Sequence, residues 1–328
     1  MKERILYFDA LKGFAILLVV MGHVIAWNFS DRSTLVIDSD SSDNVRRAAI
    51  VFTWIYSFHM PLFFMVSGYF SYKNHLSLGR MMWRRSISYL FPYLTTGFFM
   101  LALRGYYGYW FLLSLWQLTM ISLLYSKLCE SWFRKRNLTI EIILLLVLSC
   151  ALEFYSKHFE LSFNGIEMFK FAGYSMPFFF GYLLHKYEKM FQFFICKRML
   201  TYYIIVFAWL FWAKMTNFQS IFSEYNYFNW IGKSMRLLPF AGSLIFFVIF
   251  HEGINPKIEA LLSKLGGGKS GNLYLTPFIC YTNSKDRRMV AHYSDYSDDS
   301  HYADCLCPVL LYYCHHSFTP CIFVIKAF

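Results

Sequence analysis

The sequence predicts an all-α protein, a polytopic transmembrane bundle that crosses a lipid bilayer about eight times. Of its 328 residues, 57% are hydrophobic and only 16% are charged, whereas a soluble domain carries roughly 25% charged residues. The hydrophobic residues gather into runs, several of which approach the roughly 20 residues that a helix needs to cross the hydrocarbon. The basic residues lie between these runs, as they do in the loops of membrane proteins.

Eight apolar runs are candidate spans, and the charges between them predict their direction. The runs cover residues 5–27, 48–70, 87–104, 110–128, 138–155, 167–184, 199–214 and 235–251. With the N-terminus in the cytoplasm, each inward segment (73–85, 127–136, 186–198 and 257–269) carries at least three Lys or Arg. This pattern obeys the positive-inside rule. It predicts a multi-pass protein of the plasma or inner membrane with a cytoplasmic N-terminus.

The formal net charge of +11 would suggest a nucleic-acid partner in a soluble protein. Here the basic residues sit between apolar runs, so they indicate topology and contacts with anionic lipids. The sequence contains neither a glycine-rich phosphate loop nor an RNA-binding aromatic motif. We therefore expect the lipid bilayer as a partner and no nucleic acid.

The sequence divides into a membrane domain, residues 1–265, and a tail of a different kind, residues 266–328. Four cysteines crowd the end of the tail, at Cys305, Cys307, Cys314 and Cys321. One interpretation is a zinc site completed by His315 or His316, but the spacing does not give two CxxC pairs, and no metal site is assigned. A surface tail and a shifted reading frame are the other interpretations.

The first apolar run carries three ionisable residues, which are costly inside a span and need a reason to be there. Asp9 and Lys12 are three residues apart, so they can pair on one helix face, and Lys12 can extend toward the membrane surface. His23 is a candidate for chemistry, and its alternative is a hydrogen-bonded packing histidine. Lys12 and His23 are close to three helical turns apart, about 16 Å along the axis. One extended ligand could therefore touch both side chains.

A second motif runs from Phe58 to Tyr69. It contains His59 and Pro61, and a proline inside an apolar helix removes a backbone hydrogen bond. Phe64 follows, and then Ser67 and Gly68, which permit close helix approach. The alternative to a functional role here is ordinary helix packing.

These motifs, with three others in order, resemble the acyltransferase-3 family of membrane O-acyltransferases. The resemblance covers residues 4–255 and rests on the first-helix Lys12 and His23 and on Pro61, Phe64 and Ser67-Gly68-Tyr69. The other three motifs are Arg84-Arg85 ahead of Phe91-Pro92-Tyr93, Tyr109-Trp110-Phe111-Leu112, and Met176-Pro177-Phe178-Phe179-Phe180-Gly181-Tyr182. The family implies about ten spans. The short form without a soluble domain resembles the branch that acetylates sugars of surface polysaccharides, such as the fucose 4-O-acetylase-like proteins.

The resemblance implies a mechanism. Lys12, Arg84 and Arg85 would hold the phosphates of an acyl-CoA co-substrate, expected to be acetyl-CoA, and no bound cofactor is implied. His23 would be the general base, and the acceptor would be a hydroxyl of a sugar or lipid-linked glycan. Asp9, His59, Pro61, Phe64, Ser67, Gly68 and Trp110 are candidate supporting residues. A transporter or flippase for a glycan or small anion, and an inactive truncated relic, are the alternative functions.

The sequence departs from the family in three places. Lys12 stands where the family usually has Arg, so it lacks the bidentate fork of a guanidinium. Many members have a carboxylate shortly after the Trp of the fourth span, where this chain has Ser114, Leu115 and Trp116. Members also continue with a segment similar to residues 265–275 and then a final span, which is missing here. The glycine-rich tract at 266–268 can arise from bases that are easily gained or lost, so we expect a frameshift between codons 266 and 280.

Overall fold

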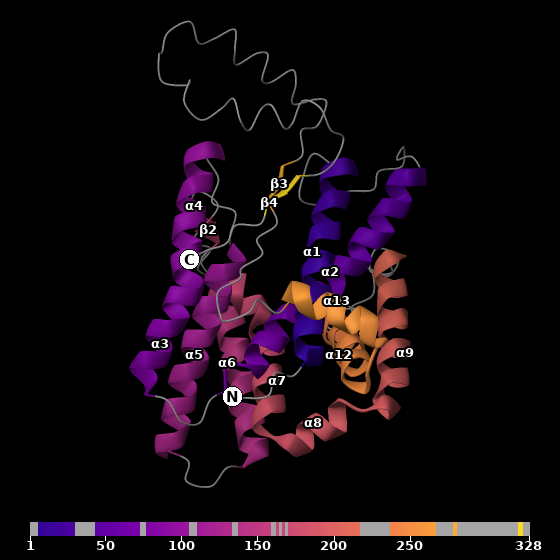
Figure 1. The fold of residues 1–328 in the computed structure, drawn as a ribbon. Helices are drawn as coiled ribbons and strands as arrows, with labels where there is room; N and C mark the ends of the chain where they lie inside the picture. Colours follow the sequence, from indigo (N-terminus) through magenta and orange to yellow (C-terminus); the bar gives the residue numbers. More distant parts are fainter. Residues whose placement is uncertain are drawn as a thin grey trace, which may run out of the picture. The chain divides into compact units, whose positions relative to one another are not determined.

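The computed structural model describes residues 6–29, 43–72, 77–104, 110–132, 137–158, 162–163, 166–167, 170–216, 237–266, 278–280 and 321–323. These residues are almost entirely helical (Figure 1). The four strands have two or three residues each and form two antiparallel pairs, in which Phe163 faces Ile166 and Ile279 faces Ile322. The expected all-α fold class is therefore confirmed for the described part of the chain.

The helices follow the predicted apolar runs closely. The long ones are α1 (Leu6–Phe29), α2 (Asp43–Tyr69), α5 (Trp110–Trp132), α6 (Leu138–His158), α9 (Lys197–Met215) and α12 (Leu237–Glu252). The shorter helices are α3 (Leu78–Arg85), α4 (Phe91–Arg104), α7 (Ser175–Lys186), α8 (Glu188–Phe194) and α13 (Pro256–Gly266). A π-helical turn, η1 (Ser86–Leu90), joins α3 to α4, and a 3₁₀ turn, η2 (Lys170–Tyr174), precedes α7. The strands are β1 (Ser162–Phe163), β2 (Ile166–Glu167), β3 (Phe278–Cys280) and β4 (Cys321–Phe323).

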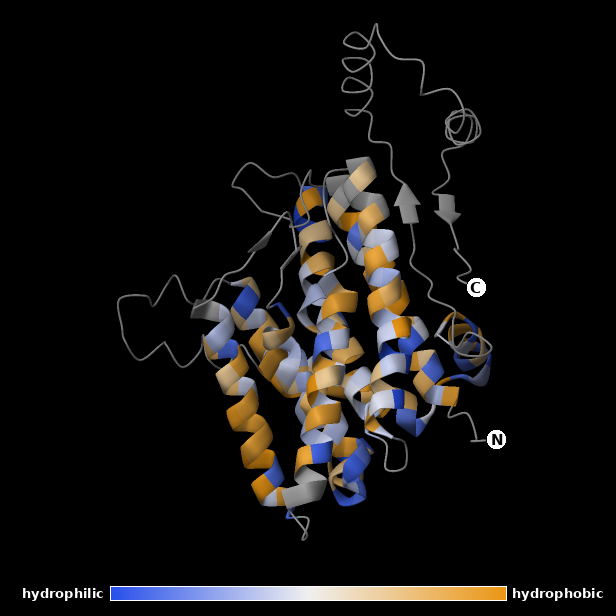
Figure 2. Cartoon of the chain, turned by 90° about the vertical axis from the view of Figure 1, so that its left-hand side faces the viewer, coloured by the Kyte–Doolittle hydropathy of each residue, from blue (hydrophilic) through white to orange (hydrophobic). Residues whose placement is uncertain are grey.

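Four of these helices, α1, α2, α5 and α6, are long and apolar enough to cross a membrane. The number rises to six if the bent pairs α8–α9 and α12–α13, at 61° and 119°, each count as one span. Figure 2 shows hydrophobic residues running along these helices. The protein is therefore a multi-pass membrane protein, while the expected count of about eight spans stays a prediction.

The two remaining predicted spans, 87–104 and 167–184, differ from the expectation for physical reasons. Helix α4 has 14 residues, although it continues α3 and η1 without a break. Helix α7 has 12 residues, which gives about 18 Å at 1.5 Å per residue and falls short of the roughly 30 Å hydrocarbon layer. Its apolar residues are buried among other helices, because eight of the twelve side chains are inaccessible.

Three basic segments that the charge pattern assigned to loops contain short helices instead. α3 lies within 73–85, α8 lies within 186–198, and α13 begins one residue before 257–269 and ends inside it. Each carries both basic and apolar side chains, and α13 buries Leu262 while Ile258 and Leu261 stay exposed. An amphipathic helix of this kind satisfies its own backbone at a membrane surface, so a basic segment there need not be a loop.

The described residues divide into two compact units, 1–16 with 53–267, and 17–52 with 268–328. The first unit contains the main hydrophobic core, to which α1, α2, α5, α7 and α12 contribute. Within it, α9 packs along α12, α5 packs on α3, η1 and η2, and α6 packs on α7. Helix α6 is the least covered of the four long candidate spans, with 17% of its apolar window buried against 61% for α2. We infer that α6 faces lipid.

Candidate functional site

Two predicted site residues on the first half of α1, Asp9 and Lys12, and a third on α3, Arg85, lie near the C-terminal end of α2. Lys12 lies 3.5 Å from the Asp9 carboxylate, so the pairing expected from their spacing is present. The Lys12 ammonium also stands over the ring of Phe70, 4.4 Å from its centroid. Phe70 directly follows α2, and Arg85, another predicted cation, also contacts it.

Arg85 reaches the same residue from α3. Its guanidinium donates one hydrogen bond to the Phe70 carbonyl oxygen, at 3.2 Å, and another to the Tyr89 hydroxyl, at 3.0 Å. A cation at the carbonyl end of a helix is favourable, because the last carbonyls of α2 carry partial negative charge. Lys12 and Arg85 therefore meet at Phe70, one at the ring and one at the backbone. Arg84, its neighbour, is exposed.

A close crossing of two helices fixes the backbone beside Lys12. A Cβ at Gly13 would lie 2.0 Å from the Leu262 carbonyl oxygen of α13, and a Cβ at Gly266 would lie 1.9 Å from the Asp9 carbonyl oxygen. Neither position can hold a side chain at this helix separation. The end of α13 therefore lies directly on the segment of α1 that carries Asp9 and Lys12.

His23 lies on α1 and is half-buried. Lys12 and His23 both lie on α1, and the expected separation of about 16 Å along its axis stays a prediction. The two residues belong to different compact units. What the structure shows of Lys12 and His23 together is that both belong to α1.

The second motif lies within α2 and is mostly packing. His59 is 2% exposed, its Nδ1 lies 2.9 Å from the Ile55 carbonyl oxygen, and its ring meets Tyr56 edge-on. Pro61 is buried inside α2, which continues past it, and Ser67 is half-buried. Gly68 makes the close helix approach that the sequence predicts, since its Cβ would lie 1.9 Å from the Phe178 carbonyl oxygen of α7.

Phe64 and Trp110 belong to a column of stacked rings that the sequence did not predict. The Tyr174 ring lies between them, 4.6 Å from Phe64 and 5.5 Å from Trp110, with interplanar angles of 15° and 21°. Phe64 is fully buried, whereas Trp110 and Tyr174 are partly accessible. The Lys170 ammonium stands over the Trp110 ring at 4.4 Å. The column combines aromatic faces with a cation, which suits an amphipathic ligand.

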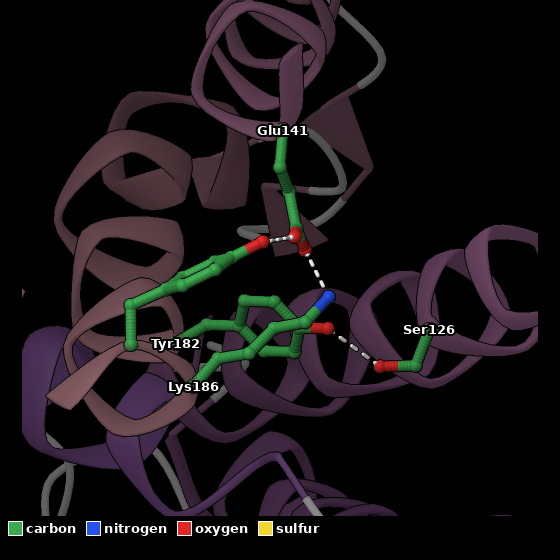
Figure 3. A network of polar contacts seen from close by, with 5 residues as sticks. Ser126, Glu141, Tyr182 and Lys186 are labelled. Carbon is green, nitrogen blue, oxygen red and sulfur yellow. Dashed lines mark hydrogen bonds and ion pairs between the residues drawn. The ribbon is translucent and has the colours of Figure 1, made fainter. Parts of the chain in front are cut away.

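A buried ion pair between α6 and α7 is a second feature that the sequence did not predict. The Lys186 ammonium lies 2.5 Å from Glu141 Oε1, and both side chains are only 8% exposed. The Tyr187 hydroxyl donates to Glu141 Oε2 at 2.5 Å, and Tyr182 and Ser126 share a second hydrogen bond at 2.8 Å (Figure 3). In the sequence, Lys186 looked like one of the basic residues that mark an inward segment. The residue that could have indicated an ion pair was Glu141, an acid at the start of the apolar run 138–155.

The described residues contain no group of three or more His, Cys, Asp or Glu side chains that could hold a metal ion. The proposed zinc ligands of the tail, Cys305, Cys307, Cys314, His315 and His316, lie outside the described residues. Cys321 is the first residue of β4, and its side chain is not described. The zinc interpretation is therefore neither supported nor opposed.

Comparison with curated proteins and with solved structures finds no match. A family model described as an acyltransferase domain matches residues 5–268, which is most of the chain. The match ends near the expected boundary between residues 265 and 266, which itself stays a prediction. The matched residues include α1, the end of α2 and α3, and so Asp9, Lys12, Arg85 and His23. The chain therefore belongs to the acyltransferase-3 family of membrane acyltransferases.

Proposed function

We propose that the protein is an O-acyltransferase of the plasma or inner membrane that moves an acetyl group from cytoplasmic acetyl-CoA to a sugar hydroxyl. The acceptor is a surface polysaccharide or a lipid-linked glycan, as in the fucose 4-O-acetylase-like branch. The observation that carries the proposal is the meeting of Lys12 and Arg85 at Phe70. Lys12 from α1 and Arg85 from α3 thus supply two cations near the N-terminal end of α1, the helix that also carries His23.

The proposed donor site uses the cations for phosphate binding. Lys12 and Arg85 hold the pyrophosphate of the donor, and exposed Arg84 adds a third cation beside it. Arg offers a planar set of donors that suits phosphate, and Lys contributes a point charge. The pantetheine arm then extends along α1, and the distance of about 16 Å between Lys12 and His23 suits an extended arm.

The proposed chemistry requires one proton acceptor. Neutral His23 takes the proton from the acceptor hydroxyl as its oxygen attacks the thioester carbonyl. The carbon–sulfur bond then breaks, the ester forms, and the leaving thiolate takes up the proton to give free CoA. His23 ends the cycle neutral.

The test uses the purified full chain with acetyl-CoA and a panel of methyl glycosides, and follows both thiol release and sugar acetylation. His23→Ala should abolish transfer while membrane insertion is unchanged, because one substitution barely alters the hydropathy of the span. Wild-type transfer rates in this variant would refute the role of His23. No transfer by the wild-type chain would refute the enzyme, and sugar flux into proteoliposomes would then favour the transporter.

Lys12 provides a second, independent test. Lys12→Arg should retain activity, since it keeps the charge and restores the residue that the family usually has. Lys12→Ala should raise the KM for acetyl-CoA and leave kcat nearly unchanged. A fall in kcat with an unchanged donor KM would contradict the phosphate-binding role.

A further inference from the structure

Two histidines that the proposed mechanism does not use are connected, through aromatic rings, to the residues proposed to bind the donor. They belong to a set of four basic side chains, from α1, α3, α7 and α12, that surround one aromatic cluster. The aromatic cluster consists of Tyr7, Phe8, Tyr69, Phe70 and Phe191. Lys12 and Arg85 contact it at Phe70. His185 and His251 contact it elsewhere.

The histidine contacts are direct. The His185 ring lies 4.5 Å from the Tyr69 ring. The His251 ring meets Tyr7 edge-on at 5.5 Å and Phe191 at 5.1 Å. Phe8 joins these contacts to Lys12, because its ring lies 4.4 Å from Tyr7 and 4.9 Å from Phe70. All four basic residues therefore contact one connected set of aromatic residues, in which Phe8 is buried and Tyr7, Tyr69, Phe70 and Phe191 are partly accessible.

Helix α1 sets the order of these groups. Tyr7 lies five residues before Lys12, about 7.5 Å nearer the start of the helix, and His23 lies on the other side of Lys12. If the thioester is at His23 and the pyrophosphate is at Lys12, the nucleotide end of the donor must continue past Lys12 toward Tyr7. That direction leads to His251 and, across the aromatic cluster, to His185.

We propose that His185 and His251 bind the 3′-phosphate of the coenzyme A nucleotide, whose adenosine packs against the aromatic cluster. The inference rests on the proposed function and names the part of the donor that this surface recognises. Both histidines are exposed and can donate an N–H to a phosphate oxygen. Glu252 lies 3.9 Å from Nδ1 of His251, so Nε2, on the other side of the ring, is the atom that meets the phosphate. The enzyme thereby selects acyl-CoA over acyl donors that lack this phosphate.

A purely structural role for these residues makes a different prediction. Both lie in the last turn of their helices, where a cation interacts favourably with the helix dipole. Loss of that interaction would lower stability. It would not distinguish two ligands that differ by one phosphate.

The experiment measures the dissociation constants of CoA and of 3′-dephospho-CoA by titration calorimetry of the full chain in neutral detergent. The variants are His185→Phe and His251→Phe, which keep the ring contacts and remove the N–H donors. Lys189→Gln is the matched control. It removes an exposed charge from α8, two residues before Phe191 and so on another side of that helix.

A hydrogen bond to a charged group contributes about 1.5–3 kcal/mol, so each histidine variant should weaken CoA binding about tenfold or more. Binding of 3′-dephospho-CoA should change less than twofold, and Lys189→Gln should change neither. Equal weakening of both ligands, no weakening of CoA, or the same loss in the control would overturn the inference. Absence of CoA binding by the wild-type chain would instead refute the proposed function together with this inference.

Discussion

The contribution of the buried ion pair Glu141–Lys186 to the free energy of unfolding can be measured by substituting each partner. Lys186→Met removes the ammonium and keeps most of the side-chain volume, which leaves the Glu141 carboxylate buried with the Tyr187 hydroxyl. Glu141→Gln leaves the ammonium without its counter-charge, among the rings of Tyr72, Tyr182 and Tyr187 at 5.6–5.8 Å. At 8% exposure for both side chains, breaking one partner should cost about 3–5 kcal/mol.

The double variant makes the prediction quantitative. Removing both charges leaves no uncompensated ion, and replacement of a buried pair by neutral groups is often close to neutral. Glu141→Gln with Lys186→Met should therefore cost about 2 kcal/mol or less. The coupling energy from the double-mutant cycle should then reach about 4 kcal/mol or more.

The assay is reversible unfolding of purified protein in mixed micelles, with denaturing detergent as the titrant and helical circular dichroism as the signal. Glu188→Gln is the control, because the same change at an exposed residue that accepts a hydrogen bond from Gln192, at 3.3 Å, should cost less than about 1 kcal/mol. Single variants that cost as little as this control, or that add without coupling, would show that solvent screens the pair. The reasoning from burial would then be wrong.

Three further changes test other parts of the structure. Gly181→Ala should lower the free energy of unfolding by about 1–3 kcal/mol, because its Cβ would lie 1.9 Å from the Met65 carbonyl oxygen. Gly79→Ala is the control: nothing lies within 4 Å of its Cβ, so it should raise stability by up to about 1 kcal/mol through helix propensity. Equal unfolding curves for the two variants would contradict the close crossing. Trp116→Phe removes the 2.9 Å hydrogen bond from Trp116 to Ser86 and should lower the free energy of unfolding by about 0.5–1.5 kcal/mol. Ser86→Ala removes the same hydrogen bond and should cost the same. Unequal losses of stability would indicate that packing, not the hydrogen bond, is responsible. Nucleotide sequencing should show, downstream of codon 266, another frame that encodes an apolar span of about 20 residues; if neither alternative frame contains one, the tail is genuine.

The sequence predicted the long apolar helices, but it predicted neither the short basic helices α3, α8 and α13 nor which apolar helices are too short to cross a membrane. Every predicted apolar run contains helical residues. A single apolar segment in a membrane satisfies its own backbone groups by forming a helix. Helix α7 shows the limit of this reasoning. A helix that is buried among other helices and one that faces lipid are both apolar, so residues 167–184 predicted a span where α7 has 12 residues.

Apart from the close helix approach at Gly68, the candidate site was predictable only within single helices. The Asp9–Lys12 pair follows from their spacing of three residues. The meeting of Lys12 with Arg85 does not, because it depends on where the chain after α2 leaves Phe70 and how α3 returns to it. The contacts of His185 and His251 likewise depend on tertiary packing, and a histidine in the last turn of a helix has an ordinary local explanation.

The crossing of α1 and α13 makes the position of the first helix depend on the last residue of α13. Gly266 touches the backbone of Asp9 and Gly13, so any substitution at codon 266 would push on the helix that carries Lys12. The glycine-rich tract where the reading frame is expected to slip begins with this same codon. If Lys12 binds the donor as proposed, a side chain at the last residue of α13 should therefore disturb donor binding in the first helix.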